Sequence, residues 1–433
     1  MRSSVRFVGL IMMCVCSLLQ AGNFALLGGT VKDVALFEPG EEITFLLRIL
    51  EDDVAVAGKK ITWTLSFDGG GEEKGEGIAG ADGLEIVTSM DHPGFIRLQA
   101  KAFDEDGTPL QGLVSSWGKM KTDDIYFDGG AGVSPEMLRP IEEPEDFDEF
   151  WEGMRAKLAA VPMVVDRVEL ESQDPQVKIY AVTITCAGAM PVTGYLTIPA
   201  DAKPGSLKAV CSFHGYGVNK HKAPTKGRHD EISFNINAHG MTLGESDEYY
   251  AEFKKKTSGY AFNKQENSDP ETAYFHDMSL RVMRALEFVK SLPEWNGRDL
   301  ESNGGSQGGL QGLWGAGIDP DVTSCNNWSP WCCDLGGVEV GRMKGWRPEY
   351  SEALAYYDPV YHVKRTQAKI HLIANLGDYT CPPSGVWIVY NQVPHDRKSM
   401  EVKQGCTHSY TMDPYMSFTV SPEGITKVGI KEK

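Results

Sequence analysis

A serine between glycines stands out in the second half of the chain, within Asn303-Gly304-Gly305-Ser306-Gln307-Gly308-Gly309. Gly304, Ser306 and Gly308 form the pattern G-x-S-x-G, which is the spacing of a nucleophile elbow on a strand-to-helix turn. The glycines fit this geometry, because a strained turn needs neighbours without Cβ atoms so that strand and helix can pass close by. The pattern therefore predicts Ser306 as a nucleophile with an exposed hydroxyl.

A serine nucleophile needs a base to take its proton and an acid to orient that base, in the chain order serine, acid, histidine. Asp378 directly follows an apolar run at 369–376, and His408 follows the next run at 399–402. The other candidates for the base are poorly placed: three histidines precede or accompany the wrong strands, and one lies inside a strand, in the order His214, His239, His276 and His371. The other candidates for the acid do not directly follow a strong buried strand, and they are Asp334, Asp358 and Asp396. We therefore expect Asp378 and His408 to complete a triad with Ser306.

The oxyanion of an acyl-transfer intermediate needs two backbone N–H donors. One is expected from Gln307, the residue after the nucleophile. The other is expected from His214-Gly215-Tyr216-Gly217, which follows the apolar run 207–213. We assign the second donor to Tyr216, and a plain turn at this loop is the alternative.

The elements around these residues alternate between strands and helices, which is typical of an α/β domain with a mainly parallel sheet. A helix is predicted at 275–292 from its apolar spacing, followed by a short strand around Leu300, the elbow, and a second helix lean enough to pack on a sheet. Further strands are predicted at 177–185, 192–198, 207–213 and 233–237, after an acidic-capped helix at 144–158. The catalytic domain is expected to span 129–433.

Residues 23–128 have a different pattern, with period-two alternation at 41–49, 60–67 and 94–100 between glycine-rich turns. Such short strands predict a small antiparallel, immunoglobulin-like β-sandwich, joined to the rest by a flexible junction at 128–132. It could be a spacer, a wall beside the active site, or a sugar-binding module with Trp63 and Trp117 as stacking platforms. Trp63 lies within a strand alternation, which favours core packing for that residue.

The first 22 residues predict a cleaved secretory signal, with Arg2 and Arg6 before an apolar core that is too short to span a membrane comfortably. A secreted or periplasmic location follows, with no membrane association after cleavage. The net charge of −18 argues against nucleic acid and anionic membrane surfaces as partners.

Nine cysteines occur in the sequence, and Cys14 and Cys16 lie in the predicted signal. The other seven show no C-x-x-C zinc spacing and are best interpreted as small buried hydrophobes, with one disulfide as the alternative. We expect no metal or cofactor.

Residues from about 134 to 433 resemble the acetyl xylan esterase and cephalosporin-C deacetylase family, carbohydrate esterase family seven. Six segments carry the resemblance: PEDFDEFW at 144–151, FHGY at 213–216, RALEFVKSLP at 284–293, GGSQGG at 304–309, YDPV at 357–360 and GDYTCPPS at 377–384. The resemblance implies an α/β-hydrolase fold and a serine esterase that deacetylates xylo-oligosaccharides and similar small acetylated substrates. It also implies the triad Ser306, Asp378 and His408, with Tyr216 and Gln307 as the oxyanion hole.

The chain departs from that family at three places. Asn237-Ala238-His239-Gly240-Met241 stands where the family has an Arg-Gly-Gln stretch, Ser409 follows His408 where Glu is usual, and the family usually lacks a sandwich in front. The first two departures put the substrate range and the family's hexameric assembly in doubt, so a homo-oligomer stays open. The third can shape access to the site.

The sequence thus predicts an exported carbohydrate esterase whose partner is an acetylated oligosaccharide or a small acetyl ester. Two alternatives are another hydrolase on the same fold, acting on a peptide or a uronic acid ester, and a polysaccharide-binding protein without catalysis. About 105 residues of sandwich cannot form the propeller that an oligopeptidase normally carries, and an intact set of Ser306, Asp378 and His408 disfavours a binding protein.

Overall fold

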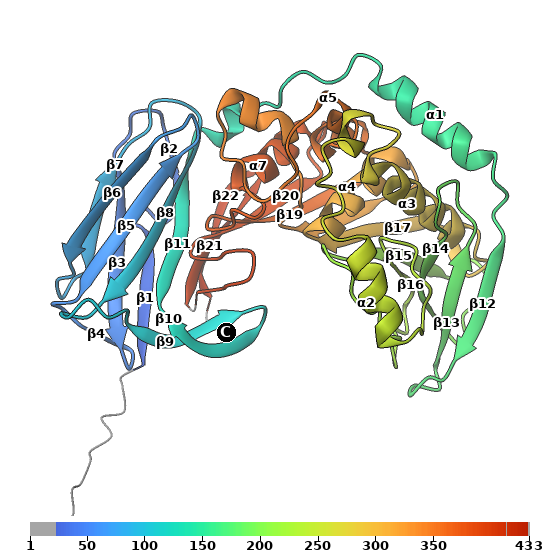
Figure 1. Cartoon of the computed structure of the whole chain (residues 1–433), viewed down its shortest axis with the longest axis horizontal. Coiled ribbons are helices and arrows are strands. Elements are labelled where there is room, and N and C mark those ends of the chain that lie inside the picture. Colours follow the sequence, from blue (N-terminus) through green and yellow to red (C-terminus); the bar gives the residue numbers. More distant parts are fainter. Residues whose placement is uncertain (1–22, 413, 432–433) are drawn as a thin grey trace, which may run out of the picture.

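The computed structural model describes residues 23–412 and 414–431, so the predicted signal at 1–22 lies outside the described residues. Figure 1 shows a sandwich of strands beside a larger part in which helices cover a long twisted sheet. The two parts have separate hydrophobic cores, and each core is built from the apolar positions that the strand and helix patterns predict.

Two sheets form the N-terminal sandwich, and nearly all their strand pairs are antiparallel, as the alternation predicts. The four-stranded sheet contains β1 (Phe24–Thr30), β3 (Ile43–Glu51), β4 (Val54–Ala55) and β7 (Leu84–Thr88). The five-stranded sheet contains β2 (Leu36–Phe37), β5 (Lys60–Phe67), β6 (Glu72–Ile78), β8 (Gly94–Phe103) and β11 (Tyr126–Val133). The immunoglobulin-like class stays a prediction.

The expected flexible junction at 128–132 is wrong, because these residues form the middle of β11 and are buried. Their glycines allow close approach: a Cβ on Gly129 would lie 2.3 Å from Gln404 Oε1, and one on Gly130 would lie 2.3 Å from Ile96 O. The same residue type serves flexible linkers and tightly packed strands, so composition alone misplaced this segment.

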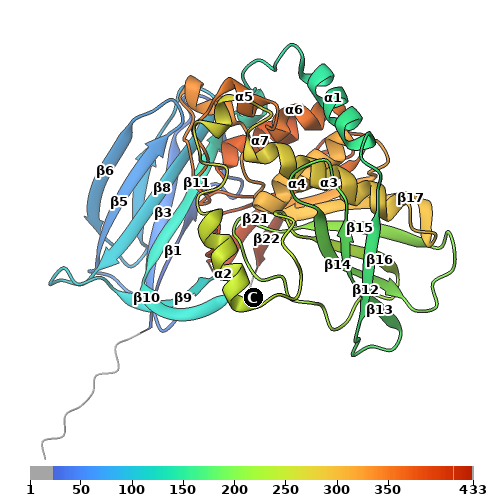
Figure 2. The same ribbon diagram turned by 45° about the vertical axis from the view of Figure 1, so that its right-hand side comes forward.

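A separate hairpin leaves the sandwich between β8 and β11. Its strands are β9 (Gln111–Ser116) and β10 (Lys119–Asp124), which pair with each other in a two-stranded sheet of their own. Figures 1 and 2 show the hairpin reaching from the sandwich toward the larger part of the molecule.

The larger part is organised on an eleven-stranded sheet, ordered β12-β13-β14-β16-β15-β17-β18-β19-β20-β21-β22. Its centre, from β16 to β20, is parallel, and antiparallel strands extend both edges. The strand bounds are β12 (Val165–Leu170), β13 (Val177–Ile184), β14 (Val192–Pro199), β15 (Leu207–Phe213), β16 (Glu231–Ile236), β17 (Trp295–Gly305), β18 (Ser324–Trp328), β19 (Lys369–Asn375), β20 (Lys398–Lys403), β21 (Tyr415–Ser421) and β22 (Gly424–Lys431).

The α-helices are α1 (Phe147–Ala159), α2 (Asp247–Lys256), α3 (Tyr274–Lys290), α4 (Gln307–Ile318), α5 (Glu352–Ala355), α6 (Pro359–His362) and α7 (Pro383–Gln392). The predicted helices at 144–158 and 275–292 correspond to α1 and α3, and the predicted strands at 177–185 and 192–198 are β13 and β14, which pair antiparallel. No helix among the described residues is both long and apolar enough for a membrane span.

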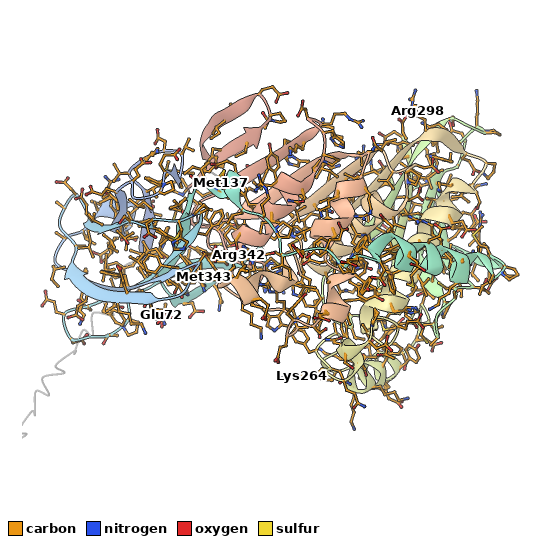
Figure 3. All side chains as sticks on the ribbon, turned by 90° about the horizontal axis from the view of Figure 1, so that it is seen from above. Glu72, Met137, Lys264, Arg298, Arg342 and Met343 are labelled. Atoms are coloured by element: carbon orange, nitrogen blue, oxygen red, sulfur yellow. The ribbon has the colours of Figure 1, made fainter. Side chains whose placement is uncertain are left out.

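The sandwich contacts the larger part of the molecule through one end of its five-stranded sheet. Phe95 of β8 packs against Trp387 of α7, with ring centroids 5.7 Å apart, and Asp68 accepts a hydrogen bond of 2.8 Å from Met343 N. Figure 3 shows Arg342 and Met343 at this junction. Burial raises the pKa of Asp68 to about 6, which marks a carboxyl held away from water between the two parts.

Candidate active site

Ser306 stands at the strand-to-helix turn that the sequence predicts. It follows the last residue of β17 and precedes the first residue of α4, and its backbone has φ 55° and ψ −125°. A non-glycine residue with such angles is strained, and strain of this kind persists only where the surrounding structure holds it. The elbow is therefore formed, with the Ser306 side chain half-buried at the turn.

The glycines around Ser306 are required by close packing. A Cβ on Gly304 would lie 2.5 Å from the Gly308 backbone, and one on Gly308 would lie 2.1 Å from Phe213 O. A Cβ on Gly305 would lie 1.9 Å from the Trp328 indole. Strand, helix and neighbouring strands thus meet at distances that only glycine allows.

Asp378 and His408 are brought together from two loops at the carboxyl ends of neighbouring parallel strands, β19 and β20. His408 Nδ1 lies 2.8 Å from Asp378 Oδ2, and Asp378 Oδ1 accepts hydrogen bonds from Thr380 N at 3.0 Å and Cys381 N at 2.9 Å. Asp378 is fully buried, while the His408 side chain is 13% exposed. An ionised Asp378 would hold Nδ1 protonated and leave Nε2 free to accept a proton.

Cys381 lies between this pair and Ser306, a neighbourhood that the sequence could not predict because the cysteines were interpreted only as core residues. Its thiol lies close to the Ser306 side chain, and burial raises its pKa well above the usual value. Its sulfur and the ligand atoms of Asp378 and His408 lie within 4.8 Å of one another. The arrangement resembles a three-ligand metal site, but a neutral thiol and a mutually hydrogen-bonded pair are poor metal ligands, and the predicted triad would by itself account for the grouping.

The other described cysteines match the interpretation as buried hydrophobes. All are free thiols, and only Cys186 is not fully buried. The disulfide alternative is therefore not supported among the residues that the structure describes.

The predicted oxyanion donors lie on either side of the elbow. Gln307 is the first residue of α4, so its backbone N–H has no acceptor within the helix. The loop with Tyr216 follows β15, and a Cβ on Gly215 would lie only 3.9 Å from Ser306 Cβ. The Tyr216 loop thus passes close to the elbow, and the Gln307 N–H stands at a helix N-terminus, which favours negative charge.

Tyr260 connects the Tyr216 loop to the elbow at Gln307. Its hydroxyl donates to Gln307 Oε1 at 2.7 Å and accepts from Gly217 N at 2.9 Å. Its ring stacks on Tyr216, with centroids 4.2 Å apart and an angle of 12° between the planes. Tyr260 therefore fixes the loop 214–217, the predicted oxyanion loop, relative to the elbow, across a sequence distance that no local pattern reveals.

Residues 237–241, which differ from the pattern of the family that the sequence resembles, contact the Tyr216 loop through His239. Burial lowers the pKa of His239 to about 4, so the ring is neutral. Its Nε2 lies 3.3 Å from Gly217 O, and because a carbonyl oxygen can only accept, Nε2 carries the ring proton and donates. The unprotonated Nδ1 therefore accepts a hydrogen bond from the Tyr274 hydroxyl at 2.5 Å. The stretch 237–241 thus contacts the Tyr216 loop through His239.

We expect Tyr260→Phe to lower kcat by about tenfold to 100-fold with a smaller change in KM, since oxyanion contacts strengthen only in the transition state. The ring and its stacking remain, and only the hydroxyl is lost. Steady-state kinetics on a simple acetate ester would measure this. Tyr249→Phe, whose hydroxyl lies by Thr242, is the matched control, and equal kinetics of the two variants would contradict the role of Tyr260.

The loop that carries His408 rests on the sandwich. The Gln404 side chain accepts from Gly130 N at 3.0 Å and donates to Gly130 O at 2.8 Å, and Gln404 is only 3% exposed. Tyr410 and Met412 belong to the hydrophobic cluster of the sandwich, and the ring of Tyr410 lies 4.8 Å from that of Tyr126. The sandwich thus lies beside the candidate site and supports the loop that carries the predicted base, His408.

We expect Gln404→Ala to lower the free energy of unfolding by about 2–4 kcal/mol, because it leaves two buried backbone groups of Gly130 without a partner. A looser His408 loop should also reduce kcat about tenfold. Denaturant unfolding and kinetics measure the two effects. The exposed Gln367→Ala is the control, and an unfolding free energy within 0.5 kcal/mol of the parent's, the usual range for surface changes, would contradict the contact's role.

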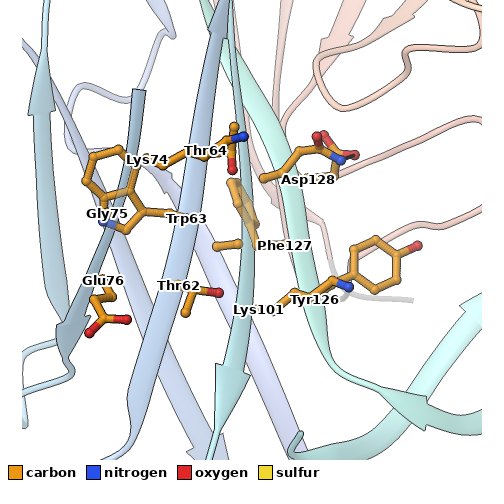
Figure 4. A pocket seen from close by; sticks show the side chains of 12 residues that line it. Thr62, Trp63, Thr64, Lys74, Gly75, Glu76, Lys101, Tyr126, Phe127 and Asp128 are labelled. Atoms are coloured by element: carbon orange, nitrogen blue, oxygen red, sulfur yellow. Dashed lines mark hydrogen bonds between the residues drawn. The ribbon is translucent and has the colours of Figure 1, made fainter. Parts of the chain in front are cut away.

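Two hollows lie in the parts of the molecule described above, one beside the Tyr216 loop and one on the sandwich. A polar one of about 450 Å³ begins at the oxyanion loop and is lined by His214, Gly215, Tyr216, Gly217, Asn219, Lys220, His221, Lys222, Asn235, Asn237, Ala238 and His239. Another of about 600 Å³ lies over β5, β6, β8 and β11 of the sandwich (Figure 4). Trp63 borders it, packs on the sandwich core and crosses Gly75, where a Cβ would lie 2.2 Å from the ring. Trp63 is half-buried, so the core interpretation holds for the face that packs on the sandwich, while the rest of the ring faces the hollow.

Comparison with known proteins identifies a family. The sequence model of the acetyl xylan esterase (AXE1) family matches residues 137–419, which is more than half of the chain. The chain belongs to this family. The resemblance identified from the sequence is thus confirmed, and the predicted esterase is confirmed at the level of the AXE1 family.

A curated relative is acetyl esterase Axe7A of Xylanibacter ruminicola, with 29% identity over 289 residues. The match covers 62% of this chain and 65% of the relative, so it spans less than two thirds of that protein. It gives no account of the residues outside the matched segment.

Two solved structures share the fold of the catalytic part. The acetyl xylan esterase from Paenibacillus sp. R4 has 23% identity and a TM-score of 0.53, covering 63% of this chain and 93% of its own. Acetyl xylan esterase 1 from Thermoanaerobacterium sp. JW/SL YS485 has 20% identity and a TM-score of 0.51, covering 63% and 92%. The prediction of an α/β-hydrolase-type fold for this part is confirmed at the level of the overall fold.

Proposed function

We propose that the protein is an exported serine esterase that removes acetyl groups from xylo-oligosaccharides or similar small acetylated sugars. The observation that carries the proposal is the pairing of His408 with a buried Asp378 beside a strained Ser306 elbow. Kinship with acetyl xylan esterases supports the acyl group, and the polar hollow at the oxyanion loop suits a leaving group rich in hydroxyls.

In the proposed mechanism, the Ser306 hydroxyl exchanges its contact with Cys381 for His408 Nε2 when the acetyl group enters. His408 takes the proton as Ser306 Oγ attacks the acetyl carbonyl carbon. The N–H groups of Gln307 and Tyr216 hold the oxyanion. Collapse expels the sugar oxygen, which receives the proton from His408, and water then cleaves the acetyl-serine by the same steps to give acetate.

The first experiment measures acetate released from acetylated xylo-oligosaccharides by residues 23–433, with a nucleophile variant as the blank. Release by the parent alone would support both the substrate class and the mechanism. Hydrolysis of a simple acetate ester without release from the oligosaccharides would keep the chemistry and reject the sugar. Inactivity on both substrates would reject the enzyme.

A further inference from the structure

An aromatic residue of the sandwich reaches the proposed catalytic base. Trp117 stands at the tip of the β9–β10 hairpin, and its ring centroid lies 5.6 Å from that of His408 at an angle of 83°. Its backbone N–H donates to Ser409 O at 2.7 Å, directly after the base. The hairpin is thus fixed against the catalytic loop at this residue.

Trp117 is strained at this position. Its φ is 51°, and the following Gly118 has φ 72°, so the two-residue turn has the positive angles of a type I′ turn. Asn-Gly is the preferred sequence for such a turn, and a bulky side chain is disfavoured in the left-handed region. The indole is therefore present at this tip despite a local cost.

Core packing does not explain the residue either. Trp117 is 71% exposed and lies outside both described hydrophobic clusters, whereas Trp63 packs on the sandwich core. Contact with the His408 ring covers only part of the indole. A strained, exposed aromatic residue beside a reacting group points to contact with a ligand.

We propose that Trp117 is a stacking platform for the sugar whose acetyl group is removed, an inference that rests on the proposed function. His408 must return a proton to the sugar oxygen, so the leaving sugar lies within a few ångströms of its ring and next to the indole. The C–H face of a pyranose is apolar and fits the flat face of an indole. The sandwich thereby contributes a specificity-determining residue to the site.

Trp117→Asn is the sharpest test, because Asn-Gly suits the type I′ turn and keeps the hairpin. We expect kcat/KM on acetylated xylo-oligosaccharides to fall about tenfold to 100-fold, mainly through KM, as for the loss of an apolar contact with the substrate. Hydrolysis of ethyl acetate, which has no ring to stack, should stay within about twofold of the parent. Trp117→Tyr should recover most of the loss, and Met120→Asn, an exposed position on the same hairpin, is the matched control.

Three results would overturn the proposal. Unchanged kinetics of Trp117→Asn on the oligosaccharides would show that no stacking occurs. An equal loss on both esters with a shifted pH–rate profile would show that the indole only orients His408. A parent that cleaves ethyl acetate but no acetylated oligosaccharide would reject the proposed substrate, and the platform with it, before any variant is compared.

Discussion

Ser306→Ala should lower kcat by about 10,000-fold to 1,000,000-fold on any acetate ester, the usual cost of losing a serine nucleophile. No other hydroxyl is held at the elbow, and the oxyanion donors alone cannot form an acyl-enzyme. The variant should fold, since alanine removes one oxygen and leaves the backbone strain unchanged. Acetate release under single-turnover and steady-state conditions measures the loss.

Ser409→Ala is the matched control, because Ser409 lies beside His408 and contributes only backbone contacts. Its activity should stay within about threefold of the parent's. A Ser306→Ala variant that retains more than one hundredth of the parent's kcat would place the nucleophile elsewhere in the chain.

Asp378→Asn should lower kcat by about 10,000-fold near neutral pH, as expected when the base adopts the wrong tautomer. The asparagine oxygen can still accept from Thr380 N and Cys381 N, so the loop keeps its shape. Its amide would then donate to His408 Nδ1, which places the ring proton on Nε2 and removes the acceptor for the Ser306 proton.

A pH–rate profile and a thermal unfolding curve separate this effect from a loss of structure. The exposed Asp396→Asn, at an acid that the sequence analysis rejected, is the control and should match the parent. If Asp378→Asn kept kcat within tenfold of the parent's, the hydrogen bond to His408 would not set the tautomer.

Local patterns predicted the elements that hold the site. The run 60–67 is β5, and the runs at 369–376 and 399–402 are β19 and β20, because alternating or continuous apolar residues commit a short segment to a sheet. The elbow was predictable for the same reason, since its glycines are required by contacts within a few residues and with the adjacent strands.

The contacts that support the site could not be predicted, because they join segments far apart in the sequence. Tyr260 contacts Gln307, Gln404 contacts Gly130, and Trp117 contacts His408. No motif or residue spacing in the sequence predicts these three contacts. The glycines at 128–132 misled for a related reason: close packing and flexibility select the same residue. The α2 helix was missed because its apolar face is small and its sequence strongly charged.

The pairing of Gln404 with Gly130 also decides how this protein can be recombined with its relatives. The sandwich and the segment 404–412 are far apart in the gene but form one packing unit. Any single crossover between residues 134 and 403 would separate them and join each to a foreign partner. A functional chimera would have to inherit both ends of the chain from one parent, so the exchangeable module is the middle of the gene.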